Sequence, residues 1–272
     1  MLKINIKKYL IMKKIIIIGA GAMGSAFAVP CLENKNEVTI IGTHLEDDLI
    51  DSIKSNNNFH PALKVELPTK LKVEKYEKLK SILEGEVDII VAGVSSIGIE
   101  WFVNQISKNY KKNLPIILLT KGLAIEDNEL ITLSDKIKKL LKKQGHEEVN
   151  VSAIKGPCLA AGLAYKMRTG TVIANPDIKE TEKLKKIIST DYYSTEISDD
   201  LTGVELAGAI KNIYSMLIGA SEGLSNSKAP KEIQSKYYLN TSASLIHRSI
   251  SEMVEFVSYY GGKVDTVYGL AG

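Results

Sequence analysis

The feature that most constrains this chain is a glycine-rich turn near its N-terminus. Residues 19–24 read Gly-Ala-Gly-Ala-Met-Gly, directly after four isoleucines and before a segment that predicts a helix over 22–33. A strand, a Gly-x-Gly-x-x-Gly turn and a helix bind dinucleotides, because glycine lets the backbone turn sharply and approach the pyrophosphate closely. The helix N-terminus presents free N–H groups to the same anion. The predicted cofactor-binding residues of this turn are Gly19, Gly21 and Gly24.

Short apolar runs alternate with amphipathic segments as far as about residue 198. The runs lie at 15–18, 38–41, 87–92, 116–119, 149–154 and 171–174, and the helical patterns at 22–33, 46–55, 76–83, 97–110, 128–143 and 179–188. Runs this short and rich in Val and Ile indicate strands buried on both faces of a parallel sheet. The alternation predicts an α/β fold with a doubly wound, Rossmann-type parallel sheet.

Beyond residue 198 the sequence shows only helical patterns. Leu206, Ile210, Ile213, Leu217, Ala220 and Leu224 recur every three or four residues. They predict one long helix, and a second pattern over 238–260 stops at two glycines. We therefore expect an N-terminal extension over 1–12, a dinucleotide-binding domain over 13–198 and a smaller all-α substrate domain over 199–272.

Charge and cysteine content exclude several other classes of protein. The 35 basic residues nearly balance the 32 acidic ones over 272 residues, which gives no basic patch for nucleic acid. The uncharged stretch over 15–29 is shorter than the roughly 20 residues that span a bilayer. Cys31 and Cys158 stand alone, so we expect no disulfide framework, no metal site and a cytoplasmic location. A homodimer stays open.

The choice between NAD and NADP depends on the end of the second predicted strand. This segment reads Ile-Gly-Thr-His over 41–44. It has no carboxylate for a ribose 2′-hydroxyl and no arginine for a 2′-phosphate, although Thr43 and His44 could bind either. We expect either cofactor, with a slight preference for NADP(H).

Two loops at strand ends carry candidate residues for substrate. Lys121 follows the strand over 116–119, and Gly156 and Cys158 follow the strand over 149–154. Ligands of an open α/β sheet bind at the carboxyl ends of its strands, so an ammonium there would lie beside the nicotinamide. An ordinary surface lysine and a small buried thiol are the alternative interpretations.

The long helix carries the third group of candidates. Small and polar residues recur on one face at Glu205, Gly208, Lys211, Asn212, Ser215 and Gly219. A lysine that is partly desolvated beside another cation has a lowered pKa, which suits proton exchange with an alcohol or a carbonyl. The alternative is a solvated helix face.

These residues resemble the soluble, prokaryotic-type NAD(P)-dependent glycerol-3-phosphate dehydrogenases. The matching blocks are collinear and lie at 19–26, 120–123, 156–157, 205–212 and 266–272. The resemblance implies that Lys211 accepts the proton of the C2 hydroxyl and that Lys121 contacts substrate and cofactor. It also implies substrate contacts at Gly156, Cys158 and Asn212, and cofactor contacts at Ala22, Met23, Thr43 and Ala160.

By the same resemblance, the chain reduces dihydroxyacetone phosphate, a small-molecule phosphate, to sn-glycerol 3-phosphate for phospholipid synthesis. Two departures stand against it. The family often has Ala-x-Glu where this chain has Ala-Ala-Gly over 160–162, and it continues beyond Gly272 into a Gly-Asp-Leu stretch and a phosphate-binding Arg-Asn pair. The expected helical domain is therefore partial, and activity of the short chain stays open. Alternatives are a ketopantoate-like 2-oxo acid reductase and a dinucleotide-binding remnant without catalysis.

Overall fold

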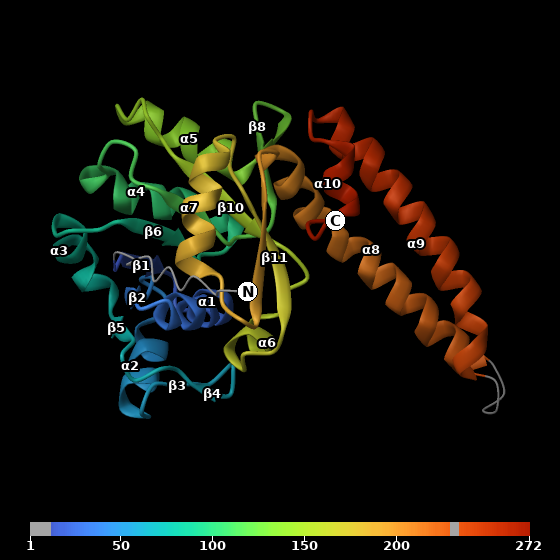
Figure 1. Cartoon of the computed structure of the whole chain (residues 1–272), viewed down its shortest axis with the longest axis horizontal. Coiled ribbons are helices and arrows are strands. Elements are labelled where there is room, and N and C mark those ends of the chain that lie inside the picture. Colours follow the sequence, from blue (N-terminus) through green and yellow to red (C-terminus); the bar gives the residue numbers. More distant parts are fainter. Residues whose placement is uncertain (1–11, 229–233) are drawn as a thin grey trace, which may run out of the picture.

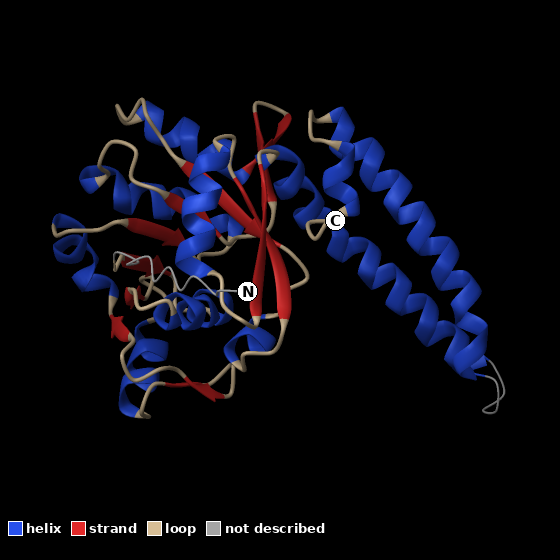
Figure 2. Cartoon of the chain, viewed as in Figure 1, coloured by secondary structure: helices blue, strands red, loops and turns tan. Residues whose placement is uncertain are grey.

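A computed structural model describes residues 12–228 and 234–272, so the predicted N-terminal extension lies almost wholly outside it. Its centre is an eight-stranded sheet with the order β12-β11-β10-β7-β6-β1-β2-β5 (Figures 1 and 2). The strands are β1 (Lys14–Ile18), β2 (Glu37–Ile41), β5 (Lys72–Glu74), β6 (Ile89–Ala92), β7 (Ile116–Leu118), β10 (Val151–Lys155), β11 (Thr169–Ala174) and β12 (Tyr193–Ser198). Six neighbouring strands of this sheet are parallel, namely β10, β7, β6, β1, β2 and β5. This arrangement confirms the Rossmann-type prediction.

The last two strands depart from the expected parallel arrangement. β11 runs antiparallel to β10, and β12 runs parallel to β11. An antiparallel neighbour needs no long crossover, and the connection between β10 and β11 holds only the short helix α6 (Ala160–Ala164). The longer helix α7 (Ile178–Ile188) then makes the crossover to β12.

Helices cover both faces of the sheet, so its central strands are buried on two sides. One face carries α1 (Ala22–Glu33), α2 (Asp47–Ser55), α6 and α7, and the other carries α3 (Leu79–Glu84), α4 (Ile99–Ile106) and α5 (Leu133–Lys143). The isoleucines of β1 alternate between these two cores, with Ile15 and Ile17 in the first and Ile16 and Ile18 in the second. This alternation explains why an unbroken apolar run forms a strand here.

The prediction of a helix over 128–143 is wrong for residues 128–132. β8 (Leu123–Glu126) and β9 (Glu129–Thr132) form a hairpin there, and α5 begins only after Thr132, whose Oγ1 accepts a hydrogen bond from the Asp135 N–H. Asp127 and Asn128 both adopt positive φ, at 54° and 62°. Two such residues make the turn that a tight hairpin requires. A second unpredicted hairpin joins β3 (Phe59–His60) to β4 (Val65–Glu66).

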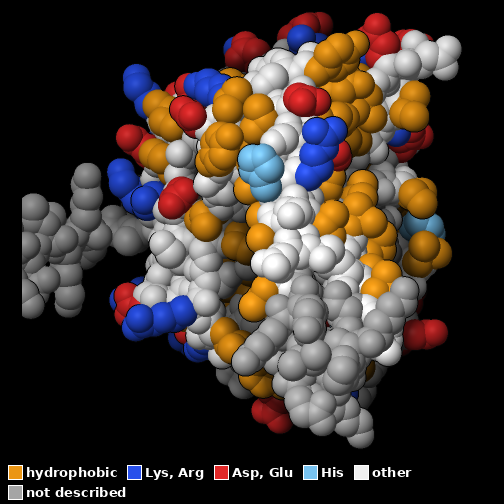
Figure 3. Space-filling model, turned by 90° about the vertical axis from the view of Figure 1, so that its right-hand side faces the viewer, with side chains coloured by type: hydrophobic (Ala, Val, Ile, Leu, Met, Phe, Trp, Pro, Cys, Tyr) orange, Lys and Arg blue, Asp and Glu red, His pale blue; other side chains and the backbone are white. Residues whose placement is uncertain are grey.

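The C-terminal region is a helical hairpin that projects from the sheet domain (Figure 1). It consists of α8 (Leu201–Lys228) and α9 (Gln234–Tyr259), with the unpredicted α10 (Val264–Tyr268) near its base. The apolar stripe expected along α8 is buried only at that base. Farther out, Ile213, Leu217 and Leu224 are 55%, 49% and 62% exposed, and hydrophobic side chains lie among charged ones on this side (Figure 3). No helix in the described ranges is long and apolar enough to cross a membrane.

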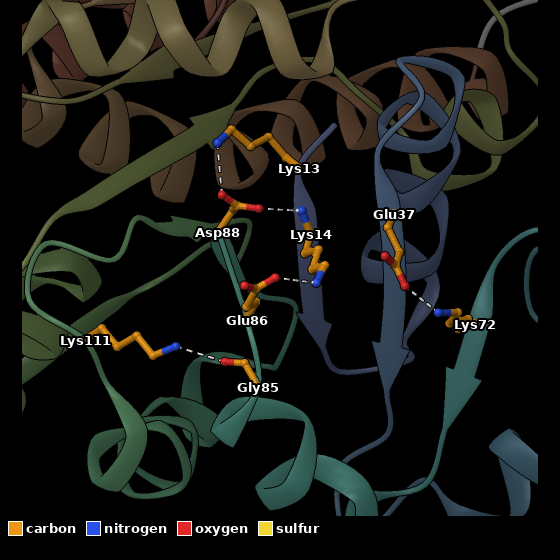
Figure 4. A network of polar contacts seen from close by, with 8 residues as sticks. All are labelled: Lys13, Lys14, Glu37, Lys72, Gly85, Glu86, Asp88 and Lys111. Carbon is orange, nitrogen blue, oxygen red and sulfur yellow. Dashed lines mark hydrogen bonds and ion pairs between the residues drawn. The ribbon is translucent and has the colours of Figure 1, made fainter. Parts of the chain in front are cut away.

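Ion pairs fasten the amino-terminal edge of the sheet (Figure 4). Lys13 Nζ lies 2.9 Å from Asp88 Oδ1, and Lys14 Nζ lies 2.8 Å from Glu86 Oε2. The other carboxylate oxygen of Asp88 accepts the Lys14 N–H at 2.8 Å. These contacts join the starts of β1 and β6, and each exposed pair is worth about 0–1 kcal/mol. All the predicted site residues belong to the opposite half of the fold.

Candidate active site

The glycine-rich turn connects β1 to α1, and two of its glycines are required by the fold itself. Gly19 has φ of +110°, and a Cβ there would lie 2.7 Å from the carbonyl carbon of Gly93. A Cβ on Gly24 would lie 2.4 Å from the Gly19 oxygen. Gly21 differs, because the nearest atom to an added Cβ would be Glu46 Oε1 at 3.9 Å. The space outside Gly21 is thus open, as the approach of a pyrophosphate requires.

A histidine that the sequence did not single out supports this turn. The Ala20 carbonyl accepts a hydrogen bond from Ser25 Oγ at 2.9 Å and lies 3.0 Å from His60 Nε2. His60 Nδ1 accepts the Leu63 N–H at 3.2 Å, so the imidazole proton is on Nε2 and is donated to Ala20. His60 is buried in the unpredicted β3–β4 hairpin.

Glu46 brings a carboxylate to the same turn. Its Oε2 accepts the Ala20 N–H at 3.0 Å and the Thr43 N–H at 2.7 Å, which joins the turn to the end of β2. This acidic group lies two residues beyond the segment 41–44, at the start of the next helix, and was not predicted from the sequence. Next to it, the His44 ring lies 5.2 Å from Trp101, centroid to centroid. These residues surround the end of β2, where the adenosine of a dinucleotide is read.

The loop after β7 places Lys121 at the carboxyl edge of the sheet. Thr120 Oγ1 donates to the Val94 carbonyl at 2.6 Å, which ties this loop to the one after β6, while the Lys121 side chain is exposed. Cys158 lies after β10 and is 8% exposed, and Ala160 begins α6. Burial raises the pKa of the Cys158 thiol, although the nearby Lys121 ammonium opposes the rise. Cys158 is therefore a thiol rather than a nucleophilic thiolate.

Lys211 faces the same region from helix α8. Its Nζ donates to the Leu270 carbonyl at 3.3 Å, in the Gly-Leu-Ala block near the C-terminal end. Burial, and then the charge of Lys121, lower the pKa of Lys211 to about 8. Asn212, the next residue, is exposed. The structure thus brings Lys121 and Lys211 together from segments 90 residues apart, counted along the chain.

A buried lysine beneath these two residues was also missed. Lys155, the last residue of β10, is 2% exposed and donates to the carbonyls of Leu118 at 3.1 Å and Thr120 at 2.7 Å. Burial lowers the pKa of Lys155 to about 8, against the attraction of Glu205 on α8. Burial also raises the pKa of Glu205. A lysine between an apolar strand and Gly156 was the available signal in the sequence.

The arrangement fits a nicotinamide dinucleotide along the carboxyl edge. Thr43 and Glu46 lie at the adenosine end, the open face of Gly21 and the N-terminus of α1 would hold the pyrophosphate, and Lys121 lies toward the nicotinamide end. The individual cofactor and substrate contacts remain predictions.

Comparisons with known proteins agree with this geometry. The model of the NAD-dependent glycerol-3-phosphate dehydrogenase N-terminus matches residues 14–181, and that of the C-terminus matches 200–272. The NADP(+)-dependent glycerol-3-phosphate dehydrogenase of Archaeoglobus fulgidus is 34% identical over 256 residues, which cover 94% of this chain and 72% of the relative. A Clostridium botulinum glycerol-3-phosphate dehydrogenase [NAD(P)+] is 28% identical, with 96% and 72% coverage.

A solved structure leads to the same family. The glycerol-3-phosphate dehydrogenase of Coxiella burnetii superimposes with a TM-score of 0.78 at 26% identity, over 96% of this chain and 73% of that one. Its match and the two family models extend across both the sheet domain and the helical hairpin. The chain therefore belongs to the NAD-dependent glycerol-3-phosphate dehydrogenase family.

Proposed function

We propose that the chain catalyses the reversible, NAD(P)H-dependent reduction of dihydroxyacetone phosphate to sn-glycerol 3-phosphate. The observation that carries the proposal is the half-buried Lys211, whose pKa is lowered to about 8 beside Lys121, at the cofactor edge of the sheet. A lysine in this state can exchange a proton near neutral pH. The NADP-dependence in the name of the Archaeoglobus relative supports a slight preference for NADP(H).

The roles of the two lysines follow from their positions. The reduced nicotinamide, when bound, supplies the hydride that C2 of the substrate receives. The Lys211 ammonium donates its proton to the C2 oxygen, becomes a neutral amine and regains a proton from solvent. Lys121 keeps its charge and attracts the substrate phosphate as a point charge.

The pKa of Lys211 sets the pH dependence in each direction. Reduction requires the protonated ammonium, so its rate should fall as pH rises through about 8. Oxidation of glycerol 3-phosphate requires the neutral amine, so its rate should rise over the same interval. Lys211→Ala should lower turnover by roughly 10²- to 10⁴-fold and remove both limbs of the profile.

The test follows NADPH oxidation by absorbance with dihydroxyacetone phosphate or ketopantoate as substrate. Wild type and Lys211→Ala are compared with Lys142→Ala, a substitution at an exposed lysine in the last turn of α5. The proposal expects turnover with dihydroxyacetone phosphate that only Lys211→Ala abolishes. Preference for ketopantoate would favour the 2-oxo acid reductase, and NADPH binding without turnover of either substrate would favour the remnant.

The proposal also covers the use of the product, the location of the protein and its oligomeric state. Glycerol 3-phosphate would supply phospholipid synthesis in the cytoplasm, and the exposed apolar residues of α8 are compatible with a homodimer without nucleic-acid partners. Light scattering after size exclusion gives the mass of the particle, and a mass near 29.8 kDa would exclude the dimer.

A further inference from the structure

Lys155 connects three segments of the site. Its ammonium donates to the carbonyls of Leu118, at the end of β7, and of Thr120, directly before Lys121. Its aliphatic stem packs on helix α8 at Gly208, where an added Cβ would lie 3.0 Å from Lys155 Cγ. One side chain thus touches both the loop that carries Lys121 and the helix that carries Lys211.

Burying an ammonium is costly unless its protons are bonded and its charge is compensated. Two carbonyls accept protons from Lys155, and the charge of Glu205 attracts the ammonium while that of Lys121 repels it. Glu205 is itself 1% exposed and accepts the Ser134 N–H at 3.1 Å through Oε1. Through these contacts, Lys155 and Glu205 connect β7, β10, α5 and α8 around the buried ammonium.

An apolar residue at 155 would fill the same space but could not bond the Leu118 and Thr120 carbonyls. The Thr120 hydroxyl, bonded to Val94, would then fasten this loop only to the loop after β6. Among the described residues, the bond from Lys155 is the one side-chain hydrogen bond of Thr120 that connects this loop to β10.

We propose that Lys155 is a positioning residue, whose buried ammonium holds the loop over 120–122 against α8 so that Lys121 and Lys211 face one substrate. The catalytic consequence rests on the proposed function, but the placement of Lys121 beside Lys211 does not. Two measurements therefore separate the two proposals.

The variant that removes the ammonium is Lys155→Met combined with Glu205→Gln. The second change prevents an uncompensated buried carboxylate, which could otherwise unfold the protein. Glu205→Gln alone shows what loss of the carboxylate does while the Lys155 side chain is retained, and Lys142→Met is the control for loss of an exposed lysine. Circular dichroism and NADPH titration establish that each variant is folded, with an NADPH Kd within about twofold of wild type.

The first readout needs no catalysis. Competitive acetylation followed by mass spectrometry measures the pKa of Lys211 from its labelling rate against pH. Wild type should titrate at about 8. In the double variant the pKa should rise, because Lys121 moves away and its repulsion of the Lys211 ammonium weakens. An unchanged pKa, or an equal rise in Glu205→Gln alone, would overturn the proposal.

The second readout is steady-state reduction of dihydroxyacetone phosphate. The double variant should show KM raised by at least about tenfold and a basic limb displaced to higher pH, whereas Lys142→Met keeps the wild-type values. Loss of turnover in wild type itself would refute the proposed function and leave the labelling result to decide the role of Lys155. Wild-type KM and pH profile in a folded double variant would refute that role. Should the double variant not fold, Lys155→Leu with Glu205→Gln, which has no donor at position 155, is subject to the same criteria.

Discussion

Substitution of Gly21 should weaken cofactor binding while leaving the free energy of unfolding almost unchanged. The backbone of Gly21 has φ of −59° and ψ of 170°, which valine adopts without strain, and the nearest atom to an added Cβ is 3.9 Å away. A poorer helix N-cap costs up to about 1 kcal/mol, and the stiffer unfolded chain returns a similar amount. We expect Gly21→Val to change the free energy of unfolding by less than about 1 kcal/mol.

Binding should respond very differently. The valine side chain would occupy the space through which a pyrophosphate reaches the N–H groups at the start of α1. We expect the NADPH Kd of Gly21→Val to rise at least about 100-fold, which corresponds to about 2.7 kcal/mol. Fluorescence titration with NADPH measures the Kd, and urea denaturation of the same samples measures the free energy of unfolding.

Two other glycines provide the contrast. In Gly24→Ala the new Cβ would lie 2.4 Å from the Gly19 oxygen, a backbone atom that cannot rotate away. We expect a loss of about 1–3 kcal/mol of stability as well as of binding. Gly223→Ala meets nothing within 4 Å and should gain up to about 1 kcal/mol with no effect on NADPH. Wild-type affinity in a folded Gly21→Val protein would remove the glycine turn from the binding site.

Two more predictions test contacts that the sequence did not reveal. Glu46→Gln should lower the ratio of the NADPH Kd to the NADH Kd by about tenfold, about 1.4 kcal/mol, because it removes a negative charge at the end of β2, where a 2′-phosphate would bind. Parallel titrations with the two cofactors measure this ratio. An unchanged ratio would show that Glu46 only supports the glycine turn. Asp200→Ala should cost about 2–4 kcal/mol in urea denaturation, since Asp200 caps α8 at the Gly203 N–H and also accepts the Lys263 N–H and the Thr266 hydroxyl. A smaller loss in Asp200→Asn, which keeps one acceptor oxygen, would confirm the hydrogen bonds as the cause.

The parts of the fold that the sequence predicted depend on local signals. The four isoleucines of β1 and the glycines after them define a buried strand and its turn within ten residues. The end of α9 was equally local, because Gly261, directly after the last helical turn, adopts φ of +84°, which favours glycine. In each case the steric requirement falls on residues adjacent in the chain.

The edge strands could not be found in this way. β12 reads Tyr-Ser-Thr-Glu-Ile-Ser and buries mainly Tyr193 and Thr195, so it lacks the apolar run of a central strand. β5 has only Val73 in the core. A strand at the edge of a sheet has one neighbour and a partly solvated surface, so its residues need not be apolar. Its position is determined by pairing with a distant strand.

The polar residues around the site follow a related rule. Ala20 has its N–H bonded to Glu46 and its carbonyl bonded to His60, which lie 26 and 40 residues away. The Thr120 carbonyl is bonded to Lys155, 35 residues away. A backbone group in a turn that has left the sheet ladder must find another partner, or it costs the free energy of an unmade hydrogen bond. Periodicity cannot reveal such partners, because the acceptor or donor they satisfy belongs to another segment.

This requirement also suggests why these partners matter for function. The turns that leave the ladder at the carboxyl edge are the ones that expose N–H groups and side chains to a ligand, so their backbone cannot be held by strand pairing. Glu46, His60 and Lys155 instead hold the glycine turn and the Lys121 loop through hydrogen bonds to their backbone groups. The precision of such a site depends on these supports as much as on the residues in contact with the ligand. A substitution at any of the three should therefore alter binding or turnover before it alters the sheet, whose strands remain paired without them.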